Sequence, residues 1–283
     1  MPEVTYVVTL ACRDMPGIVR ALSSAVFAID GNILENDQFT DPVTGQFCMR
    51  TRFTCEAGVE QVRDRLEGDL AAYEPTLSIR PESQRRRALV MVSQFDHCLA
   101  DLLYRAEQGD LALDIVAVVS NHGVCRDLCA RHDVPFIQVE VTPSTKSAAE
   151  DVVRDLVARH DVDLVVLARY MQIISPALCS ELSGRIVNIH HSFLPGFKGA
   201  RAYHQAYERG VKLIGATAHF VTADLDEGPI IEQDVARVTH ARRPSEFIAL
   251  GRDVERTVLA RAVGLIAEDR VMLVGQRTVV FSQ

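Results

Sequence analysis

The chain has 283 residues, of which 48% are hydrophobic and 24% are charged, as in soluble globular proteins rather than disordered ones. Its 38 acidic and 30 basic residues give a formal net charge of -8, which argues against a broad nucleic-acid-binding surface. No apolar run approaches the ~18 residues that a membrane helix requires, and residues 1–4 lack the basic-then-apolar pattern of a signal peptide. We therefore predict a cytoplasmic protein with neither nucleic acid nor a membrane as a partner.

The N-terminal 80 residues predict a small α+β domain. Residues 17–29 carry apolar side chains at helical spacing, and residues 41–45 have the composition of a hairpin turn. In chain order we predict a strand over 5–11, a helix over 17–29, strands over 32–40 and 46–54, a helix over 59–70 and a strand over 76–79. This βαββαβ order is that of a ferredoxin-like fold.

A polar segment separates two different periodicities along the chain. Residues 81–87 contain a proline and three consecutive arginines, and so short a basic run is more typical of a solvated linker than of a nucleic-acid patch. We predict a first domain of residues 1–80, a linker of residues 81–87 and a second domain of residues 88–283.

The second domain alternates strands and helices, which predicts a doubly wound, mostly parallel α/β sheet with helices on both faces. The predicted strands cover 88–93, 114–119, 136–139, 164–168 and a run ending at Asn188, and the predicted helices cover 99–107, 124–132, 147–160 and a short stretch after Pro176. A long amphipathic helix is predicted over 244–268. Residues 271–281 alternate like a terminal hairpin that packs on the core or on a neighbour.

The seven cysteines predict neither disulfides nor a metal site. An odd number of cysteines in a chain without a signal peptide is unlike a disulfide framework. Cys125 and Cys129 are one helical turn apart, but a zinc site needs more ligands than these two. His190 and His191 are adjacent, and adjacent side chains of a strand point to opposite faces. We predict that the protein holds no metal.

The stretch Asn188–Pro195 is the first candidate for chemistry. It follows the apolar run 186–187, a buried strand that gives way to a Pro/Gly loop. Side chains two apart share a face of a strand, so Asn188 and His190 are predicted side by side, where open α/β sheets bind ligands. An amide can donate to an oxyanion, and an imidazole can move a proton near neutral pH. A single Asn or His at a strand end can also be a turn or capping residue.

A second polar segment downstream favours the functional interpretation. Residues 217–221 and 230–233 are predicted as strands, and the turn between them carries Asp224, Asp226 and Glu227. An amide, an imidazole and a carboxylate together would supply an oxyanion donor, a proton carrier and a group that orients imidazole or water.

These two segments resemble the folate-dependent formyltransferase family. The resemblance is carried by Asn-x-His followed by Ser-x-Leu-Pro, and by His-Phe-Val, three residues and Leu-Asp-x-Gly-Pro. The doubled histidine of Asn188–Pro195, together with residues 199–210 and 215–219, is similar to the deformylase branch of that family. The resemblance implies an enzyme that acts on 10-formyltetrahydrofolate.

The resemblance to this family also implies the roles of individual residues. It places Asn188, His190 and Asp226 in catalysis, with Asp226 favoured over Asp224 by the Leu-Asp-x-Gly-Pro pattern. No cofactor is implied, because folate is the substrate. The loop 167–176 resembles the family's pterin-binding loop, and the loop 222–228 would close its other side. The substrate-binding candidates are Phe95, Arg169, Tyr170, Met171, Gln172, Ile174, Thr222, Asp224, Glu227 and Gly228. His219 is open between a supporting and a structural role. His191 is predicted to be structural because it points the other way, with the steering of water entry as the alternative.

The acceptor of the formyl group is argued from the residues. An amine that carries a phosphate needs a Gly-rich cradle after the first strand of the sheet. The turn here, residues 93–97, contains no glycine and includes Asp96, and no basic extension for a tRNA follows the domain. We therefore predict that water is the acceptor and that formate and tetrahydrofolate are the products. In the family such a reaction supplies formate for purine biosynthesis and balances the one-carbon folates.

Two turns of the N-terminal domain resemble the ACT domain. This resemblance implies a small amino-acid effector bound between paired copies, and therefore a homo-oligomer, either a dimer or a tetramer. The effector-binding candidates are Asp14, Gly17, Ile18, Asn32 and Ile33. Helix capping and a tight turn are the alternative roles of Asp14 and Gly17.

Two other functions stay open on the sequence. A formyltransferase with a small amine acceptor would release no formate when that amine is absent. A catalytically inactive amino-acid sensor would not bind folate, and the presence of Asn188, His190 and Asp226 together argues against it.

Overall fold

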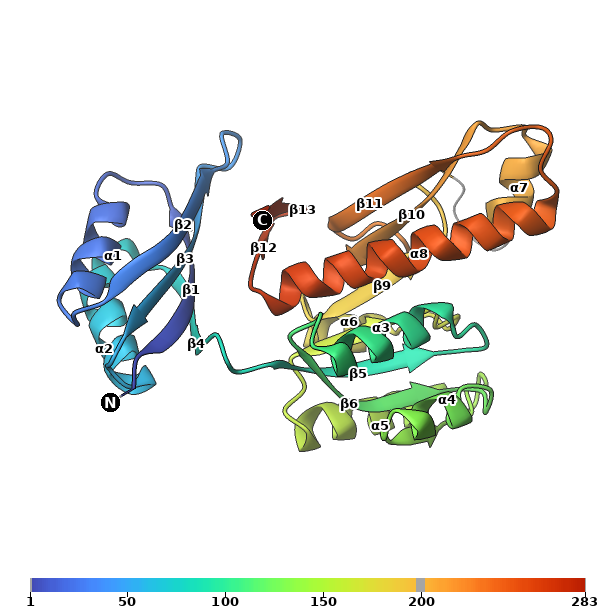
Figure 1. The fold of residues 1–283 in the computed structure, drawn as a ribbon, viewed down its shortest axis with the longest axis horizontal. Helices are drawn as coiled ribbons and strands as arrows, with labels where there is room; N and C mark the ends of the chain where they lie inside the picture. The colour runs from blue at the N-terminus through green and yellow to red at the C-terminus, as the bar shows by residue number, and fades with distance from the viewer. Residues whose placement is uncertain (1, 197–201, 283) are drawn as a thin grey trace. The chain divides into compact units, whose positions relative to one another are not determined.

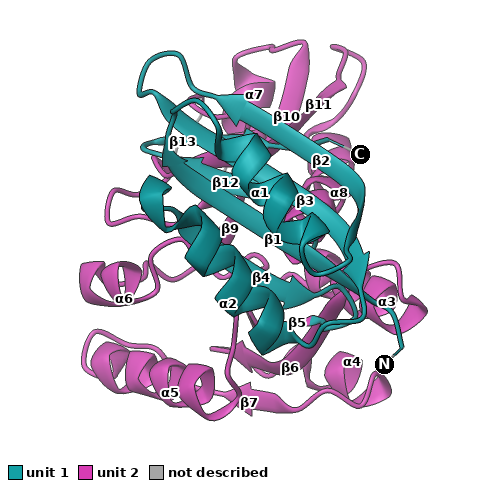
Figure 2. Ribbon diagram, turned by 90° about the vertical axis from the view of Figure 1, so that its left-hand side faces the viewer, with its two compact units in different colours: residues 1–85, 268–283 teal, residues 86–267 magenta. Residues whose placement is uncertain are grey.

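The computed structural model describes residues 2–196 and 202–282. The chain divides into two compact units, one of Met1–Arg85 with Glu268–Gln283 and one of Arg86–Ala267 (Figure 2). We call them unit 1 and unit 2. The break after Arg85 falls inside the predicted linker.

The C-terminal tail differs from our expectation. We placed it in the second domain, 88–283, but residues 268–283 belong to unit 1. Nε of Arg80 lies 2.5 Å from Oδ2 of Asp269, and both side chains are more than nine-tenths buried. Because a buried charge that loses its partner costs several kcal/mol, this pair fixes the tail to unit 1. The predicted motif residues 199–201 lie outside the described part of the chain.

Unit 1 is a four-stranded antiparallel sheet with two helices on one face (Figure 1). The strand order is β2-β3-β1-β4. The elements are β1 Val4–Arg13, α1 Ile18–Phe27, β2 Asn32–Thr40, β3 Gln46–Cys55, α2 Val59–Leu70, the 3-10 turn Ala71–Tyr73 and β4 Thr76–Pro81. The ferredoxin-like prediction is confirmed.

Alternation along β3 explains how unit 1 buries both faces of its sheet. Phe47, Met49 and Phe53 belong to the core that includes residues of α1 and α2. Cys48 points to the opposite face, as the two-residue period of a strand requires. There it packs with Val274 and Phe281 of the tail, whose strands are β12 Val271–Val274 and β13 Arg277–Val280.

Unit 2 is built on a seven-stranded sheet in the order β11-β10-β9-β8-β5-β6-β7. Strands β5 to β9 run parallel, and β10 and β11 run antiparallel at one edge. The strands are β5 Arg86–Val92, β6 Leu113–Ser120, β7 Phe136–Gln138, β8 Leu164–Leu167, β9 Ile186–His190, β10 Leu213–Phe220 and β11 Ile230–Arg237. The prediction of a mostly parallel, doubly wound sheet is confirmed.

Helices cover both faces of the unit 2 sheet (Figure 1). They are α3 His97–Gln108, α4 Arg126–Arg131, α5 Lys146–Arg159, α6 Pro176–Glu181, α7 Ala202–Glu208 and α8 Pro244–Ala267. The helices α5 and α6 supply Val153, Leu156 and Leu178 to a core shared with Leu89 and Val165 of the sheet. The long helix α8 contacts α3, α7 and strands β9, β10 and β11.

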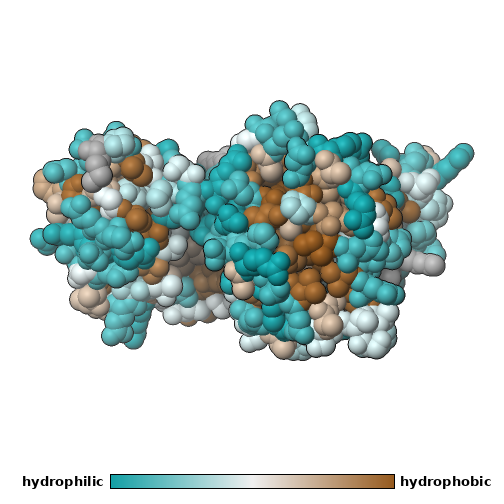
Figure 3. All heavy atoms as spheres, turned by 90° about the horizontal axis from the view of Figure 1, so that it is seen from below, coloured by the Kyte–Doolittle hydropathy of each residue, from teal (hydrophilic) through white to brown (hydrophobic). Residues whose placement is uncertain are grey.

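Hydrophilic side chains cover most of the visible face in Figure 3, and hydrophobic side chains gather in a patch on it. Large hydrophobic side chains exposed on unit 2 include Val124, Ile173 and Leu225. Within the described residues, no helix combines the length and the apolar character needed to cross a membrane.

Candidate active site

A cavity of about 330 Å³ opens beside the ends of β8 and β9 in unit 2. Its walls come from the loop after β8, from Asn188 to His191, and from the loop after β10. Parallel α/β sheets usually place ligands outside the carboxyl ends of their strands. The cavity lies where the sequence predicted the chemistry.

Polar side chains from three segments meet at this cavity. In the pairing of β9 with β10, Asn188 lies opposite His219, and its Nδ2 is 3.3 Å from Nε2 of that histidine. Nδ1 of His190 lies 3.2 Å from Oδ1 of Asp226, which the β10–β11 loop contributes. The side chains of His190 and Asp226 are 5% and 8% exposed. Because little water reaches the pair, its electrostatic interaction is weakly screened.

The backbone turns the Asp226 carboxylate toward His190. Asp226 has a φ of 58°, a left-handed conformation that is uncommon outside glycine but that Asp tolerates. Gly228 allows the loop to approach β10, because a Cβ there would lie 1.8 Å from the carbonyl oxygen of Phe220. The Phe220 amide then donates to Pro229 O at 2.9 Å. The loop is therefore held on the strand on which His219 lies.

Burial and neighbouring charges shift the pKa values of Asp226 and His219. Burial disfavours the ionised form of Asp226, but the hydrogen bond and charge of His190 outweigh it and lower the pKa of Asp226 below its ordinary value. Burial lowers the pKa of His219, and its Nδ1 donates to Phe220 O at 2.8 Å. Nε2 of His219 is therefore left as an acceptor facing Asn188.

The loop after β8 is held at both ends by hydrogen bonds. Ser93 Oγ accepts from the Met171 amide at 3.0 Å. At the other end, Glu150 accepts from the amide of Ser175 at 2.8 Å and from its hydroxyl. Arg169 begins the loop with a φ of 63°, which directs a buried, charged side chain beside the cavity. A loop fixed in this way presents a preformed wall.

Comparisons with known proteins agree with this geometry. The formyl transferase family matches residues 86–263. A formyltetrahydrofolate deformylase from Corynebacterium sp. (strain P-1) is 42% identical over 98% of this chain and 98% of its own length. The chain belongs to the formyltetrahydrofolate deformylase family. A relative of that name from Bacillus subtilis (strain 168) is 44% identical over 96% of this chain and 92% of its own. The crystal structure of the Burkholderia mallei formyltetrahydrofolate deformylase is 46% identical, with a TM-score of 0.95 over 99% of this chain and all of that one.

Most of the residues expected to bind folate in this formyltetrahydrofolate deformylase relative line the cavity. Three of the candidates lie elsewhere. Phe95 lines a neighbouring pocket, Glu227 is exposed, and Gly228 packs against β10. Asp226 lies beside His190, whereas Asp224 lines the cavity at another position. The cavity-lining candidates are Arg169, Tyr170, Met171, Gln172, Ile174, Thr222 and Asp224.

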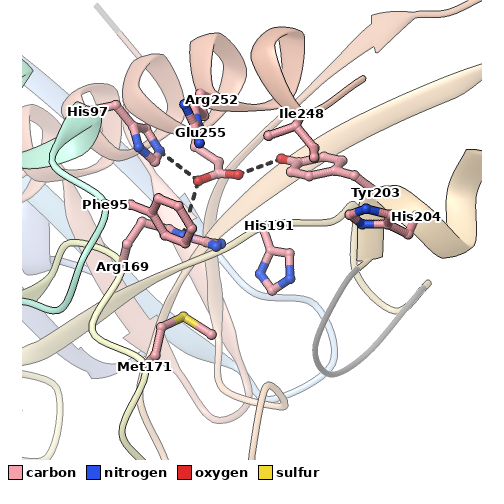
Figure 4. A pocket seen from close by; sticks show the side chains of 10 residues that line it. All are labelled: Phe95, His97, Arg169, Met171, His191, Tyr203, His204, Ile248, Arg252 and Glu255. Carbon is pink, nitrogen blue, oxygen red and sulfur yellow. Dashed lines mark hydrogen bonds and ion pairs between the residues drawn. The ribbon is translucent and has the colours of Figure 1, made fainter. Parts of the chain in front are cut away.

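The neighbouring pocket contains a buried charge network that sequence reasoning missed (Figure 4). Oε2 of Glu255 lies 2.8 Å from Nε2 of His97 and 3.4 Å from Nε of Arg169. Tyr203 donates to its other oxygen at 2.6 Å. Burial opposes the ionisation of Glu255, but these partners lower its pKa below the ordinary value. One feature of the sequence could have revealed this network. Glu255 lies four residues after the buried Gly251, so it lies on the apolar face of α8.

One group of described residues has the composition of a metal site. Ligand atoms of His97, Cys98 and Glu255 lie within 4.8 Å of one another. Burial raises the pKa of Cys98 well above its ordinary value, and a protonated thiol is a poor ligand. The Glu255 carboxylate already accepts hydrogen bonds, and a guanidinium lies beside it. The arrangement suits a buried charge network better than a bound cation, and the expectation of no metal stays a prediction.

The effector candidates of unit 1 occupy different environments. Ile18 is buried in the core, and Asn32 is exposed. Gly17 has a φ of 100°, and a Cβ there would lie 2.7 Å from the Tyr73 hydroxyl, so its backbone geometry alone requires glycine. The Asp14 amide donates to Gly45 O at 2.9 Å, and Ile33 packs against the core. Their effector role stays a prediction.

Proposed function

We propose that this protein hydrolyses 10-formyltetrahydrofolate to formate and tetrahydrofolate. The observation that carries the proposal is the buried His190–Asp226 pair, 3.2 Å apart beside Asn188, at the wall of a preformed cavity. Membership of the formyltetrahydrofolate deformylase family supplies the substrate. As a member of that family, the protein would supply formate for purine biosynthesis and balance the one-carbon folates.

The chemistry follows from the two charged partners. Water lies beside Asp226, whose ionised carboxylate positions it and accepts its proton as the oxygen attacks the formyl carbon. The protonated imidazole of His190 and the amide of Asn188 donate hydrogen bonds to the oxyanion that forms. Collapse of the tetrahedral intermediate breaks the bond to N10, which takes up a proton. The chain's own side chains supply every proton transfer, so we propose that no cofactor takes part.

His219 supports this arrangement as a positioning residue. Its Nδ1 is occupied by Phe220 O, so its Nε2 accepts one hydrogen of the Asn188 amide. The second hydrogen of that amide then points away from His219 and is available to the oxyanion. These contacts support the first of the two roles that the sequence left open for His219.

The turn after β5 supports water rather than a phosphate-bearing amine as the acceptor. It contains no glycine, and it carries the phenyl ring of Phe95. A phenyl ring at this position limits how closely backbone amides could approach a phosphate. The cytoplasmic location, the homo-oligomer and the amino-acid effector stay predictions from the sequence.

Formate release without an amine tests the proposal. Purified protein is incubated with 10-formyltetrahydrofolate in buffer free of amines, and formate and tetrahydrofolate are both quantified. We expect equal amounts of the two products. Formate that appears only after a small amine is added, or a formylated amine in its place, would establish a transferase instead.

A further inference from the structure

Unit 2 has a second pocket, of about 220 Å³, beside the folate cavity (Figure 4). Arg169, Met171 and His191 line both spaces. The second pocket extends from these shared residues toward α3, α7 and α8. The other side chains that line it take no part in the proton transfers or in the folate contacts proposed within the cavity.

The charge around this pocket is positive. Glu255 is the single acidic side chain among the described residues that line it, against the guanidinium groups of Arg169 and Arg252. Both guanidinium groups lie over one phenyl ring, that of Phe95. Burial lowers the pKa of His191 to about 4, with a further contribution from the Arg169 charge. Two guanidinium groups near one ring repel each other, and the single carboxylate of Glu255, which lies beside Arg169, compensates only one of the two charges.

Arg169 also has unused hydrogen-bonding capacity. Its side chain is 9% exposed, and its Nε and Nη1 have no hydrogen-bond partner. The ion pair with Glu255 spans 3.4 Å from Nε and leaves Nη1 without an acceptor. Buried donors are nearly always satisfied, because an unmade hydrogen bond costs free energy. In Figure 4 the guanidinium points toward His191, which also lines the folate cavity. A ligand with acceptor oxygens would satisfy it.

We propose that this second pocket binds formate, the small product of the reaction, on the guanidinium of Arg169. This inference rests on the proposed function. The ionised Asp226 repels a carboxylate formed beside it, and the positively charged second pocket shares Arg169 and His191 with the cavity. A planar carboxylate matches the fork of a guanidinium. A water molecule takes about 30 Å³ in the liquid, so the pocket holds formate together with several waters.

The proposal predicts that the two products occupy separate sites. Tetrahydrofolate stays in the cavity while formate sits in the second pocket, so a complex with both products forms. A ligand of three heavy atoms binds with a dissociation constant on the order of 1 mM at best. Formate should therefore inhibit without competing with the folate substrate.

Binding of ¹³C-formate to the full-length, folate-free protein tests the proposal. NMR line broadening is measured at constant ionic strength, with chloride replacing formate. We expect saturable binding in the wild type and a dissociation constant raised roughly fivefold in Arg252→Gln, the loss typical of an exposed charge. Arg169→Met should weaken binding at least about tenfold, because its charge is buried. Arg256→Gln is the matched control: Arg256 is exposed on the same helix, pairs with Asp253 at 3.0 Å and does not line the pocket.

Each outcome decides the proposal. Weaker binding in Arg252→Gln with unchanged binding in Arg256→Gln supports it, even if Arg169→Met does not fold. No saturable binding, or equal binding in both α8 variants, would overturn it and leave the proposed hydrolysis standing. A carboxylate-bearing amine such as glycine that displaces formate and becomes formylated would make the pocket an acceptor site and overturn both. Formate binding without formate release from the folate would refute the proposed function alone.

Discussion

Replacing Asp226 with Asn tests the proposed chemistry at its buried carboxylate. The change keeps the shape of the side chain, and Asn tolerates the φ of 58° at this position. The backbone is therefore not strained, but His190 loses the partner of a buried ion pair. We expect the free energy of unfolding to fall by up to about 3–5 kcal/mol, which urea unfolding measures before the assay. What is lost is the negative charge 3.2 Å from Nδ1 of His190.

The size of the effect follows from that distance and from the lost base. Two unit charges 3.2 Å apart attract by about 5 kcal/mol at an effective dielectric constant of ~20, before desolvation is subtracted. Removing a general base typically costs about 10²–10⁴ in rate. We expect kcat for Asp226→Asn to fall by about 10³ while KM for the folate stays within about threefold.

Formate release at saturating folate is the assay, and Glu227→Gln is the control. Glu227 is exposed in the same loop and does not line the cavity, so its replacement removes an equal charge from a side chain outside the cavity wall. Asp224→Asn tests the other carboxylate of the loop, and we expect this change to affect KM more than kcat. If Asp226→Asn kept a kcat within about threefold of the wild type, the assignment of Asp226 as the base would be wrong.

Three further predictions concern the oxyanion donor, the loop and a buried histidine. Asn188→Ala should lower kcat by several hundred-fold, about 2.7–4 kcal/mol of barrier, with a nearly unchanged unfolding curve, and wild-type-like turnover would remove Asn188 from the mechanism. Gly228→Ala should lower the free energy of unfolding by about 1–3 kcal/mol and reduce formate release, because its Cβ would meet Phe220 O; urea unfolding equal to that of the wild type would contradict this. Burial keeps His191 neutral in the folded protein, with a pKa of about 4 against 6.5 in the unfolded chain. Below pH 6.5 the unfolded chain binds a proton that the folded protein does not, so the contribution of His191 to stability is full above pH 6.5 and is lost as the pH falls toward 4. His191→Gln should thus lose about 2 kcal/mol less stability than the wild type between pH 7 and pH 5, and parallel losses in urea titrations would argue against a buried, neutral imidazole.

Local periodicity made most of the fold predictable. The alternation along β3 and the apolar run before Asn188 each fix a strand, because a strand buries every second side chain. The rule that ligands bind at the carboxyl ends of parallel strands predicts a site at Asn188 and His190, and both residues line the cavity of unit 2. The choice of Asp226 over Asp224 depended on the Leu-Asp-x-Gly-Pro motif of the family, because the two carboxylates are only two residues apart in one loop.

The remaining features depend on contacts between residues far apart in the chain. The Arg80–Asp269 pair joins positions 189 residues apart, so no local pattern could assign the tail to unit 1. The charge network of Glu255 likewise needs partners from α3, α7 and the loop after β8. Phe95 was expected at the folate, but its place depends on the direction in which the turn after β5 leaves the sheet, which composition does not determine.

The return of the tail to unit 1 affects how the protein is made and altered. Ribosomal synthesis supplies β1 to β4 well before Val274 and Phe281, which cover Cys48. The ferredoxin-like sheet therefore keeps one face incompletely covered until these residues have been made. A substitution or proteolytic cut within residues 271–281 would first disturb unit 1 and not the unit that carries Asn188.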